Sequence, residues 1–312
     1  ICFYFFGENP AIVYCIQSIL LGSTVALTYL IFRDHLKQKT GWLLLFILIV
    51  FAFFDVYKYY TFRLLSENFA IFTITLFFFY FKKALVTKKS KLYIFSGLLL
   101  GISVLTRPNI LPFSILLFLM ITSFLNRKKG YNYWLFFFSY IIIISILPLR
   151  NFLVSGDLST MIIDRNFLDY LTSIDNIPNE NVKTTDGQSL QGFVHYFKKT
   201  LFCLGYLPIL EEKYRIRPHW IIMWVGFILN ISYLIGKRRK LKLFDLSLLF
   251  FVLSFYFIII LIAPITNYGF RFLIPVLFIV LGFSFIGYER LFCNFKKSLY
   301  RNKQLTTKPK RH

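Results

Sequence analysis

The sequence predicts an all-α polytopic membrane protein, a chain that crosses a bilayer several times as helices. Hydrophobic residues make up 57% of the 312 positions, and the mean hydropathy is +0.64. Long runs of Phe, Ile and Leu alternate with short charged segments, which is typical of membrane proteins and not of a large soluble core. The net charge of +22 comes mainly from short loops between apolar runs and from the C-terminal tail. That distribution follows the positive-inside rule and argues against nucleic-acid binding.

Each predicted span is a mostly apolar run between polar segments, and a full crossing takes about 20 such residues. One apolar stretch, 92–125, is interrupted at Arg107-Pro108 and has basic residues at both flanks. As a single helix it would be about 51 Å long, against a hydrocarbon core of about 30 Å. Proline also disfavours helix at the preceding residue, so we expect a hairpin that turns at residues 106–109. The predicted spans are 11–32, 41–54, 69–81, 92–105, 110–125, 131–149, 219–236, 246–265 and 272–288.

With these spans, every strongly basic short loop falls on one side of the membrane, together with a basic tail over 289–312. The positive-inside rule makes that side cytoplasmic, so we predict a multi-pass protein of the plasma (inner) membrane with a cytoplasmic C-terminus. Only Asp34, Asp245 and Glu289 among the 14 acidic residues fall there. The other acids lie on the outer side or at its edge, and we expect the active face to be extracytoplasmic.

The longest hydrophilic segment is an extracytoplasmic loop over 150–218. Within it, residues 190–207 are too polar to span and are predicted to form an amphipathic helix on the outer leaflet. His195 lies in this segment without a second histidine or cysteine at metal-ligand spacing, which favours an interface residue over a metal ligand. The four cysteines likewise show no metal spacing, and the spans place them at different depths, so no disulfide framework is expected.

Four ionisable residues at the predicted outer ends of spans form the candidate site. An arginine in hydrocarbon is costly and marks a functional position by default, and a guanidinium fork suits phosphate. Three arginines at one depth could hold a lipid phosphate or pyrophosphate; alternatively each is a snorkelling interface anchor. The carboxylate could bind a divalent cation or act as a base, or instead pair with Arg63 four residues before it. These residues are Glu67, Arg107, Arg150 and Arg271.

Several short motifs occur in a fixed order along the chain. They are Phe6–Ala11, Leu64–Asn68, Ser96–Gly101 leading into Leu105–Pro108, Leu149–Asn151 followed by Gly156-Asp157, and Tyr268–Pro275. In this order they resemble the GT-C superfamily of membrane glycosyltransferases. The closest similarity is to the dolichyl-phosphate-mannose–protein mannosyltransferase and aminoarabinose transferase-like group (glycosyltransferase family 39-like).

The resemblance implies a GT-C-like transmembrane helix bundle with a helical outer loop. It also implies a hexosyl- or pentosyltransferase that uses a polyprenyl-phosphate sugar and an extracytoplasmic lipid, glycan or protein acceptor, with inversion. Glu67 matches the family's second acidic position, for metal binding or acceptor positioning, and Arg107, Arg150 and Arg271 match donor-phosphate positions. A divalent cation is the one cofactor that the resemblance suggests.

The family's catalytic aspartate, usually in an Asp-Glu pair, belongs to a first outer loop that has no counterpart in this sequence. Ile1 corresponds to a position just before the family's second span. We therefore expect an N-terminally truncated chain whose main base lies upstream of residue 1. Two other functions stay open: an outer-face polysaccharide polymerase or ligase acting on lipid-pyrophosphate glycans, and a transporter. A transporter should show paired broken helices in two halves, whereas the sequence shows one break.

Overall fold

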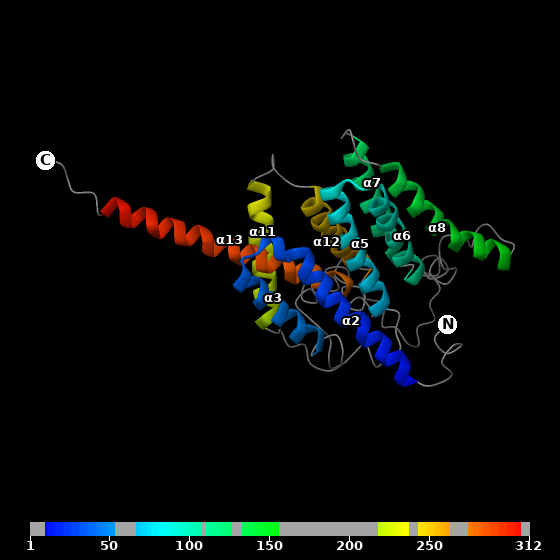
Figure 1. The fold of residues 1–312 in the computed structure, drawn as a ribbon, viewed down its shortest axis with the longest axis horizontal. Helices are drawn as coiled ribbons and strands as arrows, with labels where there is room; N and C mark the ends of the chain where they lie inside the picture. The colour runs from blue at the N-terminus through cyan, green and yellow to red at the C-terminus, as the bar shows by residue number, and fades with distance from the viewer. Residues whose placement is uncertain are drawn as a thin grey trace, which may run out of the picture.

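The computed structural model describes residues 10–53, 67–107, 110–126, 133–155, 218–236, 243–262 and 274–306 (Figure 1). Those residues are almost entirely α-helical, and none of them is in a strand. A helix overlaps each of the nine predicted spans. The helices are α2 (Pro10–Phe32), α3 (Gln38–Phe51), α5 (Glu67–Thr87), α6 (Ser90–Thr106), α7 (Leu111–Asn126), α8 (Tyr133–Ser155), α11 (Pro218–Gly236), α12 (Leu243–Ile262) and α13 (Ile274–Thr306), with a short 3₁₀ helix η1 (Arg33–His35) after α2.

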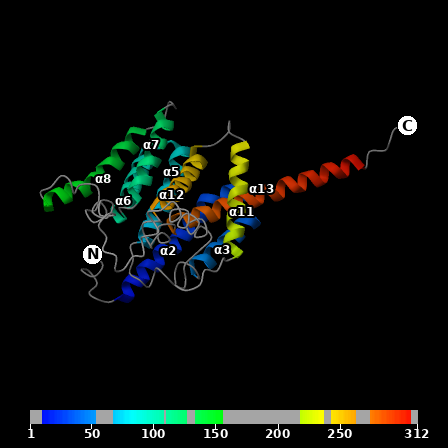
Figure 2. The same ribbon diagram turned by 180° about the vertical axis from the view of Figure 1, so that it is seen from behind.

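The helices pack as a bundle in which α5, α6, α7, α8 and α12 lie side by side (Figures 1 and 2). Helix α13 passes through the interior, and every side chain from Val276 to Ser284 on it is buried. A helix that is apolar all round is stable only when neighbours cover it on all sides, so α13 is a central element of the core. Helix α11 crosses it where two glycines meet: a Cβ on Gly287 would lie 2.0 Å from the Gly226 carbonyl oxygen.

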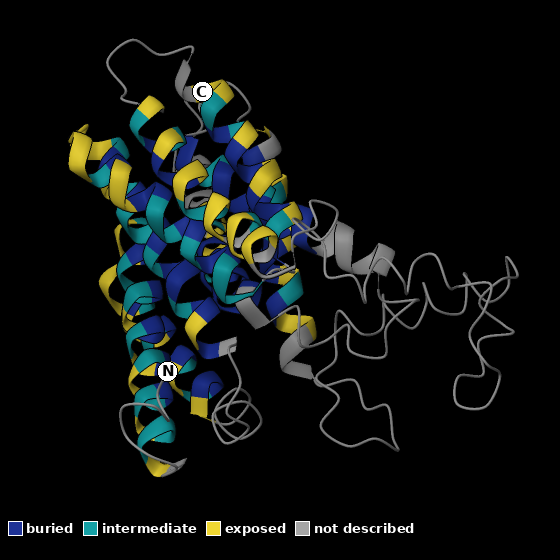
Figure 3. Cartoon of the chain, turned by 90° about the vertical axis from the view of Figure 1, so that its right-hand side faces the viewer, coloured by how far each residue is buried: buried dark blue, intermediate teal, exposed yellow. Residues whose placement is uncertain are grey.

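The outer surface of the bundle is rich in large apolar side chains. Large apolar side chains are exposed on its outside, including Trp42 (58%), Phe46 (61%) and Ile142 (63%) (Figure 3). Some hydroxyl groups lie within the apolar core; Thr28 and Thr75, for example, are buried and donate to carbonyls one turn earlier in their own helices. Such a surface suits a lipid environment, because soluble monomers rarely expose large contiguous apolar areas.

Three of the described helices are long and apolar enough to cross a membrane by length and composition, namely those over Ala11–His35, Asn68–Thr87 and Val276–Phe295. The other apolar helices in the described ranges have shorter apolar segments, of 10–17 residues. Together with the exposed apolar side chains, these three indicate membrane association. A protein with nine crossings remains a prediction.

Three helices extend six or more residues past the C-terminal boundaries predicted for their spans. Helix α5 runs six residues beyond Phe81 because its lysines have partners: Lys82 bonds to the end of α2, and Lys83 lies 4.3 Å from the centre of the Phe79 ring. Helix α8 continues through Pro148 to Ser155, since a proline removes only one backbone hydrogen bond and membrane helices tolerate it. Helix α13 continues through Glu289 to Thr306, so the predicted tail begins as helix.

Candidate functional site

Glu67 and Arg107 lie at the same level of the antiparallel pair α5 and α6. The two helices are joined by Lys88-Lys89 alone, and Lys88 has the left-handed φ of 55° that closes this tight link. Tyr80 of α5 stacks on Phe95 of α6, with ring centroids 6.0 Å apart. Glu67 precedes Tyr80 by 13 residues, and Arg107 follows Phe95 by 12. Because the helices run in opposite directions, the two positions differ by about one residue's rise, about 1.5 Å.

Arg150 lies at this level too, because α6 and α8 pack closely and in parallel. A Cβ on Gly97 would lie 2.0 Å from Ser139 Oγ, and one on Gly101 would lie 2.7 Å from Ile143. Gly101 follows Gly97 by four residues and Ile143 follows Ser139 by four, so the two helices run in the same direction. Arg107 follows Gly101 by six residues, and Arg150 follows Ile143 by seven. Small residues four apart are a familiar signal for close helix packing in membranes, and here they set the register between the two arginines.

Arg107 ends α6 in an extended conformation, with φ −150° and ψ 93°. Its N–H donates to the carbonyls of Ser103 and Val104 at 3.2 and 3.1 Å, and its own carbonyl accepts from Ile110 N–H at 2.9 Å. The chain therefore reverses between Thr106 and Leu111, as expected for residues 106–109. A cation at a helix C-terminus also interacts favourably with the helix dipole, so this position suits an arginine without a ligand as well.

The four predicted site residues are described to different extents. The Arg107 side chain is half-buried, and Arg150 is exposed on α8. Glu67 begins α5 beside the buried Asn68, but its side chain lies outside the description. The described residues also exclude Arg271 and positions 156–217 of the predicted loop, which contain the segment 190–207 and His195. The structure thus brings three of the four positions to one level and leaves Arg271 untested.

A divalent cation has no complete ligand set in the described part of the chain. No group of three or more His, Cys, Asp or Glu side chains is close enough there to hold a metal ion. Glu67 alone would supply one carboxylate, whereas a divalent cation takes six or more oxygen ligands, some of them water. The described residues therefore do not make a metal site by themselves.

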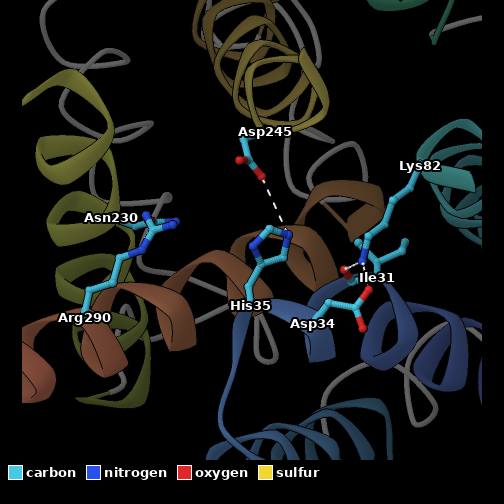
Figure 4. A network of polar contacts seen from close by, with 7 residues as sticks. All are labelled: Ile31, Asp34, His35, Lys82, Asn230, Asp245 and Arg290. Carbon is cyan, nitrogen blue, oxygen red and sulfur yellow. Dashed lines mark hydrogen bonds and ion pairs between the residues drawn. The ribbon is translucent and has the colours of Figure 1, made fainter. Parts of the chain in front are cut away.

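The opposite end of the bundle carries a polar network that the sequence analysis did not predict (Figure 4). Lys82 of α5 donates to the Ile31 carbonyl at 2.7 Å and to Asp34 Oδ2 at 2.8 Å. The Ile31 carbonyl belongs to the last turn of α2, where carbonyls have no partner within the helix. Lys82 thus caps α2 and pairs with Asp34 at once. Arg33 also lies 3.5 Å from Asp34, in an exposed pair.

Helix α13 holds the start of α3 through its Glu289 carboxylate. The Lys37 N–H, just before α3, donates to Glu289 Oε1 and Oε2 at 2.9 and 3.0 Å. An acidic group at a helix N-terminus satisfies an otherwise unpaired N–H and complements the dipole. The Lys37 ammonium donates to Cys293 Sγ at 3.1 Å, and this contact, with the nearby Glu289 charge, raises the pKa of Lys37.

His35 and Arg290 make further contacts at this end of the bundle. His35 Nε2 lies 3.9 Å from Asp245 Oδ1 on α12, with both side chains mostly covered. Arg290 of α13 donates to the Asn230 side-chain carbonyl on α11, and its guanidinium lies 4.3 Å from the centre of the Tyr233 ring. Asp34, Asp245 and Glu289 are the three acids that the topology assigns to the basic side, and each contacts a group from another element. Isolated acids among many cations are therefore the signal that could have revealed this network.

No protein-family model, curated protein or solved structure matches this chain.

Proposed function

We propose that this chain belongs to a membrane glycosyltransferase that moves a sugar from a polyprenyl-phosphate donor to an extracytoplasmic acceptor. The observation that carries the proposal is the common level of Glu67, Arg107 and Arg150, on three helices aligned by the Tyr80–Phe95 and Gly97–Ser139 contacts. Two permanent cations and a carboxylate near the ends of apolar helices suit a ligand with an anionic headgroup and a long apolar tail. The order of the sequence motifs supports the same function.

Each group has a defined part in such a reaction. Arginine at the site binds the donor phosphate and stabilises the charge that grows on it as the leaving group. The bond between the sugar's anomeric carbon and the phosphate oxygen breaks while the acceptor hydroxyl oxygen attacks from the opposite side. A carboxylate takes the hydroxyl proton. The products are polyprenyl phosphate and a glycoside of inverted configuration, and Glu67 is proposed to position the acceptor.

The orientation proposed here places the site at the extracytoplasmic face of the plasma membrane. Support comes from the other end of the bundle, which carries the exposed lysines of the α5–α6 link and the Glu289–Lys37 contact, after which the basic half of α13 follows. Under the positive-inside rule that end is cytoplasmic. A polyprenyl chain would then lie in the bilayer against the exposed apolar sides of the helices, with its phosphate level with Arg107.

Replacement of Arg107 tests the proposal. In membranes that contain the product of the full coding region, Arg107→Ala should lower transfer from polyprenyl-phosphate sugars by about 100-fold or more, since removal of one group that stabilises developing charge costs that much. Transfer is measured as released polyprenyl phosphate over a panel of radiolabelled donors. Arg33→Ala, an exposed arginine at the opposite end, is the matched control and should keep full activity.

A binding measurement separates this function from the others. Cross-linking to a photoactivatable polyprenyl phosphate should fall in the Arg107→Ala protein and stay unchanged in the Arg33→Ala protein. Normal turnover and normal cross-linking in the Arg107→Ala protein would show that Arg107 is an interface anchor and would overturn the proposal. Transfer from lipid-pyrophosphate glycans alone, with none from monophosphate donors, would instead establish a polymerase or ligase.

A further inference from the structure

The last half of α13 extends beyond the helix bundle. Burial on this helix ends near Ile286, and the side chains of Leu291, Phe292 and Phe295 are 46%, 68% and 63% exposed. The helix nevertheless continues to Thr306, and Figure 1 shows its red end well away from the other helices. From Leu291 to Thr306 this segment has 16 residues, a length of about 24 Å. We call residues 291–306 the distal helix.

The sequence of the distal helix has an apolar side and many cations. At 3.6 residues per turn, Leu291, Phe292, Phe295 and Leu299 share one side of the helix. No acidic residue occurs from Arg290 to the end of the chain, so no internal charge compensates the basic residues. The eight basic residues of that stretch are Arg290, Lys296, Lys297, Arg301, Lys303, Lys308, Lys310 and Arg311.

The contacts at Glu289 and Arg290 fix where the distal helix leaves the bundle. Glu289 accepts from Lys37 N–H and Arg290 donates to Asn230, so two neighbouring residues anchor α13 to α3 and α11. The exit point is therefore at the basic end of the bundle. An isolated helix of this length is only marginally stable in water. A helix with an apolar side flanked by cations is stabilised most at the surface of a membrane that contains anionic lipids.

We propose that the distal helix binds anionic phospholipids of the leaflet at this end of the bundle. Its apolar side inserts at the boundary between headgroups and acyl chains, and its three lysines and Arg301 contact the lipid phosphates. Charge complementarity favours anionic phospholipids over water as the surroundings of this helix. It also disfavours a second copy of the chain, because the distal helix of that copy carries the same positive charge. The proposal goes beyond glycosyl transfer and needs only that the protein lies in a membrane.

Accessibility of a spin label on the distal helix tests this. The full chain, with its cysteines replaced by serine and Leu299 replaced by a labelled cysteine, is reconstituted in phosphatidylcholine vesicles with or without phosphatidylglycerol. With phosphatidylglycerol, the label should be relaxed by oxygen and protected from a water-soluble nickel chelate. Removing four cations (K296Q, K297Q, R301Q and K303Q) should raise nickel accessibility by on the order of tenfold.

The control removes four exposed lysines from elsewhere at the same end (K39Q, K83Q, K89Q and K91Q), and the label should stay protected. High salt should also release the distal helix of the unsubstituted labelled chain, which tests the charge dependence without these substitutions. Equal nickel accessibility with and without phosphatidylglycerol would overturn the proposal. Protection that instead depends on the protein-to-lipid ratio would also overturn it, since that result indicates packing between copies of the chain.

Discussion

The two ends of the bundle use charged residues in different ways. At the basic end, charged side chains hold segments far apart in sequence together: Lys82 reaches α2, and Glu289 reaches the start of α3. At the other end, Glu67, Arg107 and Arg150 come to one level through contacts several residues away, among rings and glycines of the helix interfaces. The charges at the basic end stabilise the contacts between helices, whereas the charges at the candidate site are positioned by contacts that other residues make.

This difference separates stability from activity. Loss of a charge at the basic end should lower the free energy of unfolding, because its partner there is a backbone group or an opposite charge. Loss of a charge at the candidate site should leave stability nearly unchanged and remove ligand binding. A change in the packing between α6 and α8 should affect both stability and activity. This packing is part of the core and also sets the register between Arg107 and Arg150.

The largest expected effect is that of Gly97→Leu. Even a Cβ on Gly97 would lie 2.0 Å from Ser139 Oγ and 2.4 Å from the Phe136 carbonyl oxygen, so α8 has to move away from α6. We expect a loss of about 3 kcal/mol or more in the free energy of unfolding, measured by chemical denaturation in detergent. Any folded fraction should also have lost transfer activity, because Arg150 no longer lies level with Arg107.

Gly22→Ala is the matched control for this prediction. A Cβ at Gly22 would have no atom within 4 Å, and alanine favours the helix by up to about 1 kcal/mol. This variant should be as stable as the parent or slightly more so. A Gly97→Leu protein with parental stability and activity would show that the α6–α8 contact does not set the site.

Much of the helical layout follows from the sequence, since apolar runs of sufficient length and their basic ends are local features. A helix overlaps each predicted span, and the reversal after Thr106 follows from Pro108 and the basic flanks. The helix ends were harder to predict. Lys82 does not end α5, because the Ile31 carbonyl, 51 positions away, accepts a hydrogen bond from its ammonium, and Pro148 does not end α8.

The polar network at the basic end could not be derived from sequence spacing, because its partners are up to 256 positions apart. His35 carried no signal in the sequence, yet it lies beside Asp245. At the candidate site the sequence places charges at the ends of spans but gives no register between helices. The register depends on Gly97 and Gly101, and small residues four apart in an apolar segment are a signal for close helix packing.

At the basic end, the largest single effect is expected from Lys82. Lys82→Met keeps most of the side-chain length and removes the ammonium, which leaves the Ile31 carbonyl at the end of α2 without this donor. We expect a loss of about 2 kcal/mol in the free energy of unfolding, typical of a hydrogen bond to a charged group. The measurement is chemical denaturation in detergent, as for Gly97.

A double-mutant cycle with Asp34→Asn separates the two contributions of Lys82 to stability, its bond to the Ile31 carbonyl and its pair with the Asp34 carboxylate. The Asp34 side chain is 60% exposed, so its pair with Lys82 should contribute less than about 1 kcal/mol. Asp34→Asn alone should therefore cost less than Lys82→Met. Suppose that the two single variants lose the same free energy of unfolding and that the coupling energy equals this loss. The ion pair, and not the cap of α2, would then stabilise this end.

Glu289→Ala tests the hold of α13 on the start of α3. The alanine leaves the Lys37 N–H without its carboxylate acceptor, and loss of a cap at a helix N-terminus costs about 1 kcal/mol. Glu289→Gln should cost less, because an amide oxygen still accepts. Lys37→Gln is the control, since it removes the ammonium, with its contact to Cys293 and its attraction to Glu289, and keeps the backbone N–H. A greater loss in Lys37→Gln than in Glu289→Ala would mean that the side chain, not the capped backbone, joins these helices.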